Sequence, residues 1–92
     1  MIIRILSQGQ FEVPDSQVDA LNALDDEVHA AINAGNEVAF TNALGALLDA
    51  VHRLGGPVDI DDIVASDAIL PPADATINEA RELLQDDGLI PG

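Results

Sequence analysis

Two stretches in the middle of the chain carry apolar residues at the spacing of an α-helix, and together they predict an antiparallel helix pair. The first runs from after Ser16 to about Ala34, and the second runs from Asn36 to about Leu54. Gly35 suits the left-handed position that often follows a helix, and Asn36 suits the cap of the next helix. Two helices of about 18 residues with so short a connection form an αα-hairpin. The apolar positions are Val18, Leu21, Leu24, Val28, Ala31 and Ile32, then Phe40, Leu44, Leu47, Leu48, Val51 and Leu54.

The N-terminal residues predict a β-hairpin. Residues 2–6 are rich in β-branched side chains, residues 7–10 have the composition of a turn, and residues 11–13 alternate as a second strand. The first strand is apolar on both faces apart from Arg4, so we expect it to be covered on both sides or to lie at an interface. Residues 14–16 follow, and their side-chain oxygens are candidates for capping the first long helix.

The C-terminal segment predicts a short strand followed by a capped helix. Residues 68–70 are apolar and stop at two prolines, which suits a third short strand beside the first two. Thr76 and Glu79 form a T-x-x-E capping box, which predicts a helix from Ile77 to about Asp86.

The residues after this helix predict a hydrophobic contact that caps its C-terminal end. Asp87 and Gly88 end the helical pattern, and Leu89 and Ile90 can fold back onto the helix as its cap. Alternatively, the same two apolar side chains lie at the surface and contact a partner.

These elements predict an α+β fold, with a small two- or three-stranded antiparallel sheet packed against a long αα-hairpin and a C-terminal helix. A length of 92 residues fits a single domain that spans residues 1–92. Residues 57–67 have no decisive pattern, and a loop, a helical turn and an irregular extension all remain open for them.

The charge of the chain is strongly negative. Seventeen acidic residues stand against three arginines and no lysine, and the formal net charge is -14. Such a surface repels phosphate backbones and anionic lipid heads, so we expect no direct binding of nucleic acid or of an anionic membrane. With no Trp or Tyr and only two Phe, the chain also lacks the aromatic side chains on which the bases of single-stranded nucleic acid stack. The charge favours a basic protein partner, and it also suits adaptation to a salty cytosol.

The sequence predicts a cytoplasmic protein. It contains no cysteine, the apolar start is too short for a signal peptide, and no apolar run approaches the roughly 18 residues that span a membrane. Any contact with the membrane periphery would therefore come through a partner.

No residue pattern predicts a catalytic, cofactor-binding or metal site. Asp59, Asp61 and Asp62 suggest a cation loop, but the following residues lack the glycine and glutamate of an EF-hand, so we expect a solvated acidic loop. His29 and His52 each stand near a carboxylate at helical spacing, Asp25 and Asp49. In the predicted hairpin the two histidines lie about 16 Å apart along the helix axis, which is too far to share one ion.

Four residues are candidates for contact with a partner: Phe11, Gly45, Leu89 and Ile90. Gly45 lies inside a helix, where glycine costs about 1 kcal/mol relative to alanine. Either a close crossing of helices within the fold or a partner helix docking at this position would account for it.

Three stretches of the chain resemble a known family. They are SQGQFEV at residues 7–13, LNALDDEVHAAINAGNEVAF at 21–40, and SDAILPPADATINEARELLQDDGLIPG at 66–92. On these motifs the chain is similar to the PspA-associated domain proteins, the PspAA family, of archaea and actinobacteria. The resemblance covers nearly the whole chain and is most specific in the G-Q-F turn and the LPPADAT…GLIP tail.

This resemblance implies a non-enzymatic accessory or regulatory protein of a phage shock membrane stress response. The partner it implies is a PspA-type coiled-coil protein, reached through protein–protein interaction, and it implies no cofactor. Two other functions remain open: an acidic nucleic-acid mimic or other adaptor that binds a basic partner, and a small metal-dependent enzyme that uses His29 or His52.

Overall fold

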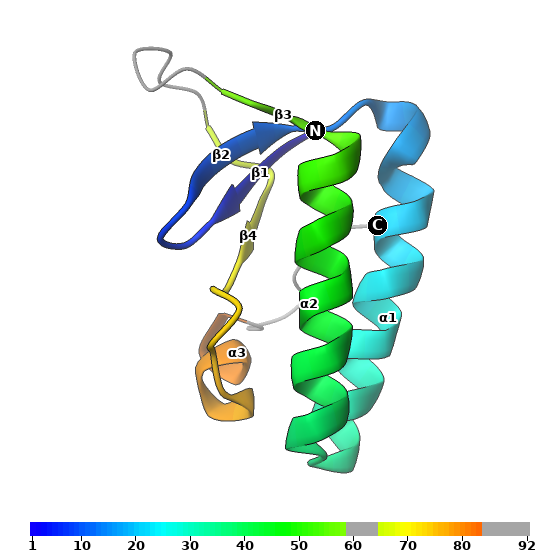
Figure 1. The fold of residues 1–92 in the computed structure, drawn as a ribbon, viewed down its shortest axis with the longest axis vertical. Coiled ribbons are helices and arrows are strands. Elements are labelled where there is room, and N and C mark those ends of the chain that lie inside the picture. Colours follow the sequence, from blue (N-terminus) through cyan, green and yellow to red (C-terminus); the bar gives the residue numbers. More distant parts are fainter. Residues whose placement is uncertain (59–64, 84–92) are drawn as a thin grey trace.

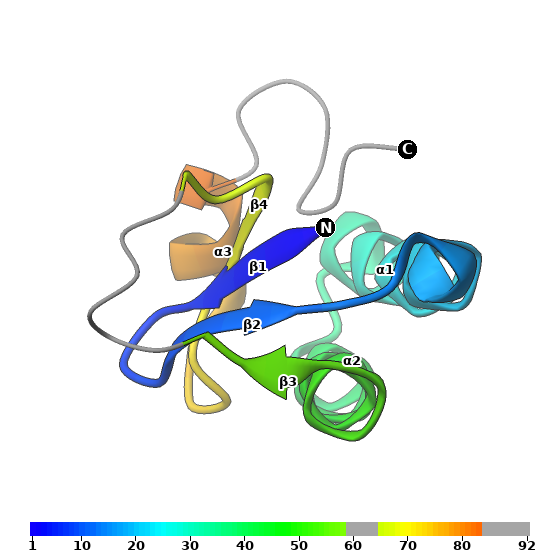
Figure 2. The same ribbon diagram turned by 90° about the horizontal axis from the view of Figure 1, so that it is seen from above.

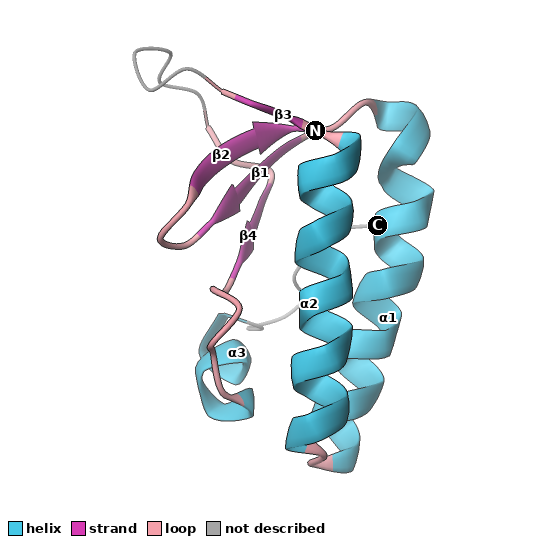
Figure 3. Cartoon of the chain, in the orientation of Figure 1, coloured by secondary structure: helices cyan, strands magenta, loops and turns pink. Residues whose placement is uncertain are grey.

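A computed structural model describes residues 1–58 and 65–83 of the chain. Four strands form one sheet, two long helices stand beside it as a hairpin, and a short third helix lies beyond the end of the last strand (Figures 1 and 3). The predicted α+β class is confirmed. The elements are β1 (Ile2–Ile5), β2 (Gly9–Glu12), η1 (Asp15–Gln17), α1 (Val18–Ala34), α2 (Glu37–Leu54), β3 (Gly56–Pro57), β4 (Ala68–Leu70) and α3 (Ile77–Leu83).

The predicted N-terminal hairpin is present. β1 and β2 are antiparallel, with Ile3 opposite Phe11 and Ile5 opposite Gly9. Positive φ angles occur at Ser7 in the turn between them, at 75°, and at Gly9, the first residue of β2, at 103°. Glycine adopts this backbone conformation without strain, whereas residues with a Cβ atom do so less readily. This explains the glycine at the second position.

The sheet differs from the predicted antiparallel arrangement of two or three strands. Its order is β3-β2-β1-β4, and β4 runs parallel to β1 with Ile3 opposite Ala68 and Ile5 opposite Leu70. The additional strand, β3, is a two-residue stretch that begins one residue after the end of α2, and it pairs with β2. The sheet is therefore four-stranded and mixed, and β1 is an inner strand.

The predicted helical hairpin is confirmed, together with its connection. Gly35 follows α1 at φ 66°, and the Asn36 side chain accepts a hydrogen bond of 3.1 Å from the Ala39 amide at the start of α2. At the other end of α1, the expected side-chain cap from residues 14–16 is wrong. These residues lead instead into the 3₁₀ turn η1, and the residue before α1 is Gln17, which makes no side-chain cap.

One hydrophobic core joins the sheet to the helices. α1 and α2 stand on the same side of the sheet (Figure 2), and the face of the sheet turned toward them buries its side chains. The buried apolar residues are Ile3, Ile5, Val13, Leu21, Val28, Ala31, Ile32, Phe40, Leu44, Leu47, Leu48, Ala50, Val51, Ala68, Leu70, Ala75, Ile77 and Ala80.

The start of α3 has the predicted capping box. The Glu79 amide donates to the Thr76 hydroxyl at 3.2 Å, and the Thr76 amide donates to a Glu79 carboxylate oxygen at 3.1 Å. A guanidinium nitrogen of Arg81 donates to the carbonyl of Ile32 at 3.1 Å, which ties α3 to the last turn of α1. The predicted end of this helix and its closing contact lie outside the described residues.

Candidate interaction surface

Exposed carboxylates lie on β2, η1, α1, α2 and α3, and in the segments on either side of β4. Arg81, one of the three arginines, is already engaged with a backbone carbonyl of α1. The described surface is therefore dominated by negative charge on the sheet, the hairpin and α3 alike. The exposed acidic residues are Glu12, Asp15, Asp19, Asp26, Glu27, Glu37, Asp49, Asp67, Asp74, Glu79 and Glu82.

Phe11, the first candidate contact, lies at the junction of the sheet and α2. It is half-buried on β2, opposite Pro57 of β3. Its ring packs against the imidazole of His52 on α2 in a T-shaped arrangement, with the centroids 4.7 Å apart and the planes at 71°. Phe11 thus has a structural contact within the chain, and its exposed part borders the outer side of α2.

Gly45, the second candidate, lies on α2 where the surface is open. A Cβ atom built on it would meet no described atom within 4 Å apart from the adjoining backbone of α2 and its two neighbours in the chain. The close crossing of helices that would have accounted for this glycine is therefore absent from the described part of the fold. The side of α2 that carries Gly45 is left uncovered there.

The other two candidates, Leu89 and Ile90, lie outside the described residues. So do Asp59, Asp61 and Asp62, the residues of the suggested cation loop. The structure therefore brings Phe11 close to α2, the helix of Gly45, and gives no position for the remaining candidates.

The two histidines make separate contacts. His29 bonds through Nε2 to Asp25 Oδ2 at 3.2 Å, within α1, whereas His52 packs on Phe11. Asp25 is only 4% exposed, so this pair lies at the edge of the core. Among residues 1–58 and 65–83, no three His, Asp or Glu side chains gather in a way that could hold a metal ion.

The burial of Asp25 was not anticipated, although the sequence contains its signal. Asp25 follows Leu21 by four residues and precedes Val28 by three, so it falls on the apolar face of α1. A carboxylate at such a position needs hydrogen-bond partners, and an imidazole one turn later can supply one.

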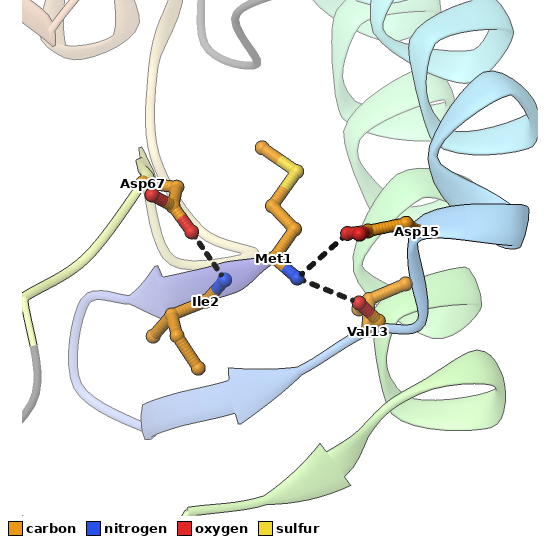
Figure 4. Close-up of polar contacts among 5 residues, drawn as sticks. All are labelled: Met1, Ile2, Val13, Asp15 and Asp67. Carbon is orange, nitrogen blue, oxygen red and sulfur yellow. Dashed lines mark hydrogen bonds and ion pairs between the residues drawn. The ribbon is translucent and has the colours of Figure 1, made fainter.

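The start of β1 forms a further polar cluster that sequence reasoning missed (Figure 4). The Met1 ammonium donates to the Val13 carbonyl at 2.9 Å and lies 3.4 Å from an Asp15 carboxylate oxygen. On the other side, the Ile2 amide donates to Asp67 at 2.8 Å. These contacts arise because β1 lies between β2 and the segment that leads into β4, an arrangement that residue spacing does not reveal.

An open pocket lies beside this cluster. Its volume is about 450 Å³, and it is bordered by the end of β2 and the end of α2. Two exposed carboxylates, those of Glu12 and Asp15, line it. The complete lining is Met1, Glu12, Val13, Pro14, Asp15, Leu54 and Gly56.

Comparison with known families decides the relationship that the motifs suggested. The sequence model of the family described as PspA-Associated protein matches residues 1–92. The chain belongs to the PspA-associated (PspAA) family. Searches of curated proteins and of solved structures each gave no match.

Membership of the PspA-associated family fits the character of the described surface. Of its candidate residues, Phe11 is half-buried at the junction of the sheet and α2, and Gly45 lies on an open stretch of α2. No helix within residues 1–58 and 65–83 is long and apolar enough to cross a membrane. For a PspA-associated protein, the surfaces that call for explanation are thus the acidic exterior and the uncovered side of α2.

Proposed function

We propose that this chain is a non-enzymatic accessory or regulatory protein of a PspA-type membrane stress response, acting through protein–protein interaction. Its partner is a PspA-type coiled-coil protein, and residues 1–92 act as one domain. The observation that carries this proposal is the match of the PspA-associated family to the whole chain. The protein acts in the cytoplasm, and the partner recruits it to the membrane periphery.

The charge of the chain supports a protein partner with a basic surface. At a net charge of -14, with exposed carboxylates on β2 and on all three α-helices, the protein attracts cationic surfaces and repels lipid and nucleic-acid phosphates. Complementary charge raises the association rate and suppresses binding to the wrong partner. The interaction should therefore weaken as salt is added, because the Debye length falls from about 10 Å at 0.1 M to about 3 Å at 1 M.

The test is a binding titration with the purified PspA homologue from the same organism, at low and at high salt. We expect saturable binding at low salt that weakens at high salt. Absence of binding at both salt concentrations would refute the proposal. A nucleic-acid-binding protein captured from the native cell in place of the PspA homologue would favour the acidic-mimic function.

The same titration separates an adaptor from an enzyme. A double variant, His29→Ala with His52→Ala, removes both imidazoles, and its folding is checked by circular dichroism. We expect the folded double variant to keep saturable binding of the PspA homologue, even where loss of the His52 side chain lowers the affinity. A small enzyme that relies on either histidine would lose its function in this variant.

A further inference from the structure

Three outward positions on α2 form a continuous line on one side of the helix. Val38, Gly45 and His52 follow one another at intervals of seven residues, which is close to two helical turns, so they share a face. We call this line, together with Thr41 and Asp49 beside it, the α2 face. It extends over about 21 Å of helix, at 1.5 Å per residue.

The two ends of the α2 face offer apolar surface. Val38 is 72% exposed, the highest value among the exposed large apolar side chains of the described residues. At the other end, the Phe11 ring packs against His52 and continues the face onto the sheet. Gly45 lies midway between them, and apart from its chain neighbours and the adjoining backbone of α2 no described atom lies within 4 Å of the place where its Cβ would be.

The glycine at the midpoint is unfavourable for the helix itself, and no contact within the described residues requires it. Its backbone is helical, and the open space around it would accept a side chain. Small residues at a helix surface allow a second helix to approach closely, because the backbones are not held apart by side chains. The position therefore suits the crossing point of a helix that the described chain does not supply.

The charge around the α2 face determines which kind of helix can occupy it. Exposed carboxylates of Glu37 and Asp49 lie on α2 itself, together with the exposed guanidinium of Arg53 in its last turn. A second copy of this chain carries the same net charge of -14 and would be repelled. A helix with a narrow apolar stripe flanked by lysine or arginine is complementary to both the apolar and the acidic parts.

We propose that the α2 face binds a cationic amphipathic helix of the partner protein, which crosses α2 at Gly45. This inference rests on the proposed function for the identity of the partner. It adds which surface of this chain binds the partner and what kind of partner segment that surface recognises. Charge steers the encounter, and the apolar contacts at Val38 and Phe11 fix the position along α2.

Two matched variants test the crossing point. Gly45→Leu fills the open space on the α2 face and replaces a weak helix former with a strong one, so its melting temperature should not fall. Ala30→Leu adds the same side chain at an exposed position of α1 and leaves the α2 face unchanged. We expect Gly45→Leu to weaken binding of the PspA homologue at least about tenfold, and Ala30→Leu to change it less than about twofold.

A second probe keeps the inference testable if the PspA homologue does not bind. It is a synthetic helix-forming peptide of about 16 residues, made of leucine and lysine with one central alanine, which spans roughly 24 Å as a helix. Its binding is followed by amide chemical shifts of the labelled wild-type protein and of both leucine variants. We expect the shifts to gather at Val38, Gly45 and His52, and to diminish in Gly45→Leu only.

The outcomes distinguish the two proposals. If wild type and Gly45→Leu bind the PspA homologue equally well, the α2 face is not its binding site, and the proposed function still stands. Failure of the homologue to bind, combined with peptide shifts on the α2 face that Gly45→Leu removes, would overturn the proposed function alone. Chemical shift changes that the peptide causes over the whole acidic surface, or that remain the same in Gly45→Leu, would refute the α2 face as the binding site.

Discussion

The rings of Phe11 and His52 pack against each other at 71° with 4.7 Å between their centroids, and this contact joins β2 to the last turn of α2. An edge-to-face pair of this kind contributes about 0.5–1.5 kcal/mol beyond the area it buries. His52 therefore helps to hold the sheet against the hairpin, a structural task distinct from the acid–base chemistry that its spacing from Asp49 suggests.

Removing either ring should destabilise the fold. We expect His52→Ala to lower the free energy of unfolding by about 0.5–1.5 kcal/mol. Phe11→Ala should lower it by more, about 1–3 kcal/mol, because a half-buried phenyl group also loses apolar contact area. Urea unfolding of both single variants and the double variant measures the coupling between them. A double variant whose loss equals the sum of the two single losses would contradict an energetic link between the rings.

The bond between His29 and Asp25 should also matter for stability. Asp25 is buried, and removal of a hydrogen-bond partner from a buried carboxylate costs about 1–3 kcal/mol. We expect His29→Ala to lower the free energy of unfolding by this amount. His29→Gln is the matched control, since its amide can still donate to the carboxylate one turn away, and it should recover part of the loss. Equal losses in both variants would show that the donor is unimportant.

Two glycines, Gly45 within α2 and Gly55 directly after its end, should respond oppositely to substitution by alanine. At Gly45 nothing described lies within 4 Å of the new methyl group, so Gly45→Ala should stabilise the protein by about 0.5–1 kcal/mol. At Gly55 the methyl group would lie 2.9 Å from the carbonyl oxygens of Glu12 and Val51 and from a methyl group of Val13. Gly55→Ala should therefore destabilise by about 1–3 kcal/mol. Thermal unfolding of the two variants provides the comparison, and changes of the same sign would contradict it.

The capping box of α3 gives a prediction confined to the C-terminal part. Thr76→Ala removes the hydroxyl that accepts the Glu79 amide, and loss of such a cap costs about 1 kcal/mol. Thr76→Ser keeps the hydroxyl and should behave like the wild type. Amide hydrogen exchange in α3 is the sharpest measurement, because fraying there should increase before the rest of the fold responds. Unchanged exchange in Thr76→Ala would show that packing alone holds the helix.

The sequence allowed the local elements to be predicted well, because each carries its own signals. Gly35, Asn36 and the capping box of Thr76 and Glu79 mark the helix ends through backbone hydrogen bonds that involve only near neighbours. The apolar stripes of α1 and α2 likewise report their buried faces directly.

The arrangement of the sheet and the surface chemistry were harder to predict. The parallel pairing of Ile3 with Ala68 joins residues from opposite ends of the chain, and no local pattern specifies it. β3 is only two residues long, and a glycine followed by a proline indicates the end of a helix more readily than a strand. The contact of Phe11 with His52 depends on both arrangements. The sequence therefore singled out Phe11 and His52 as separate candidates and did not predict that they touch.

The parallel pairing of β1 with β4 has a consequence for the order of folding. During synthesis β1 emerges first, yet one of its two neighbours in the sheet follows more than sixty residues later, as the bond from Ile2 to Asp67 illustrates. Contacts between such distant residues slow folding, since a long loop must close before they form. Until then β1 presents an unpaired, apolar edge, the kind of edge that pairs with other chains. Because every copy carries a net charge of -14, like-charge repulsion opposes such pairing between copies, and this links the acidic composition to folding as well as to recognition.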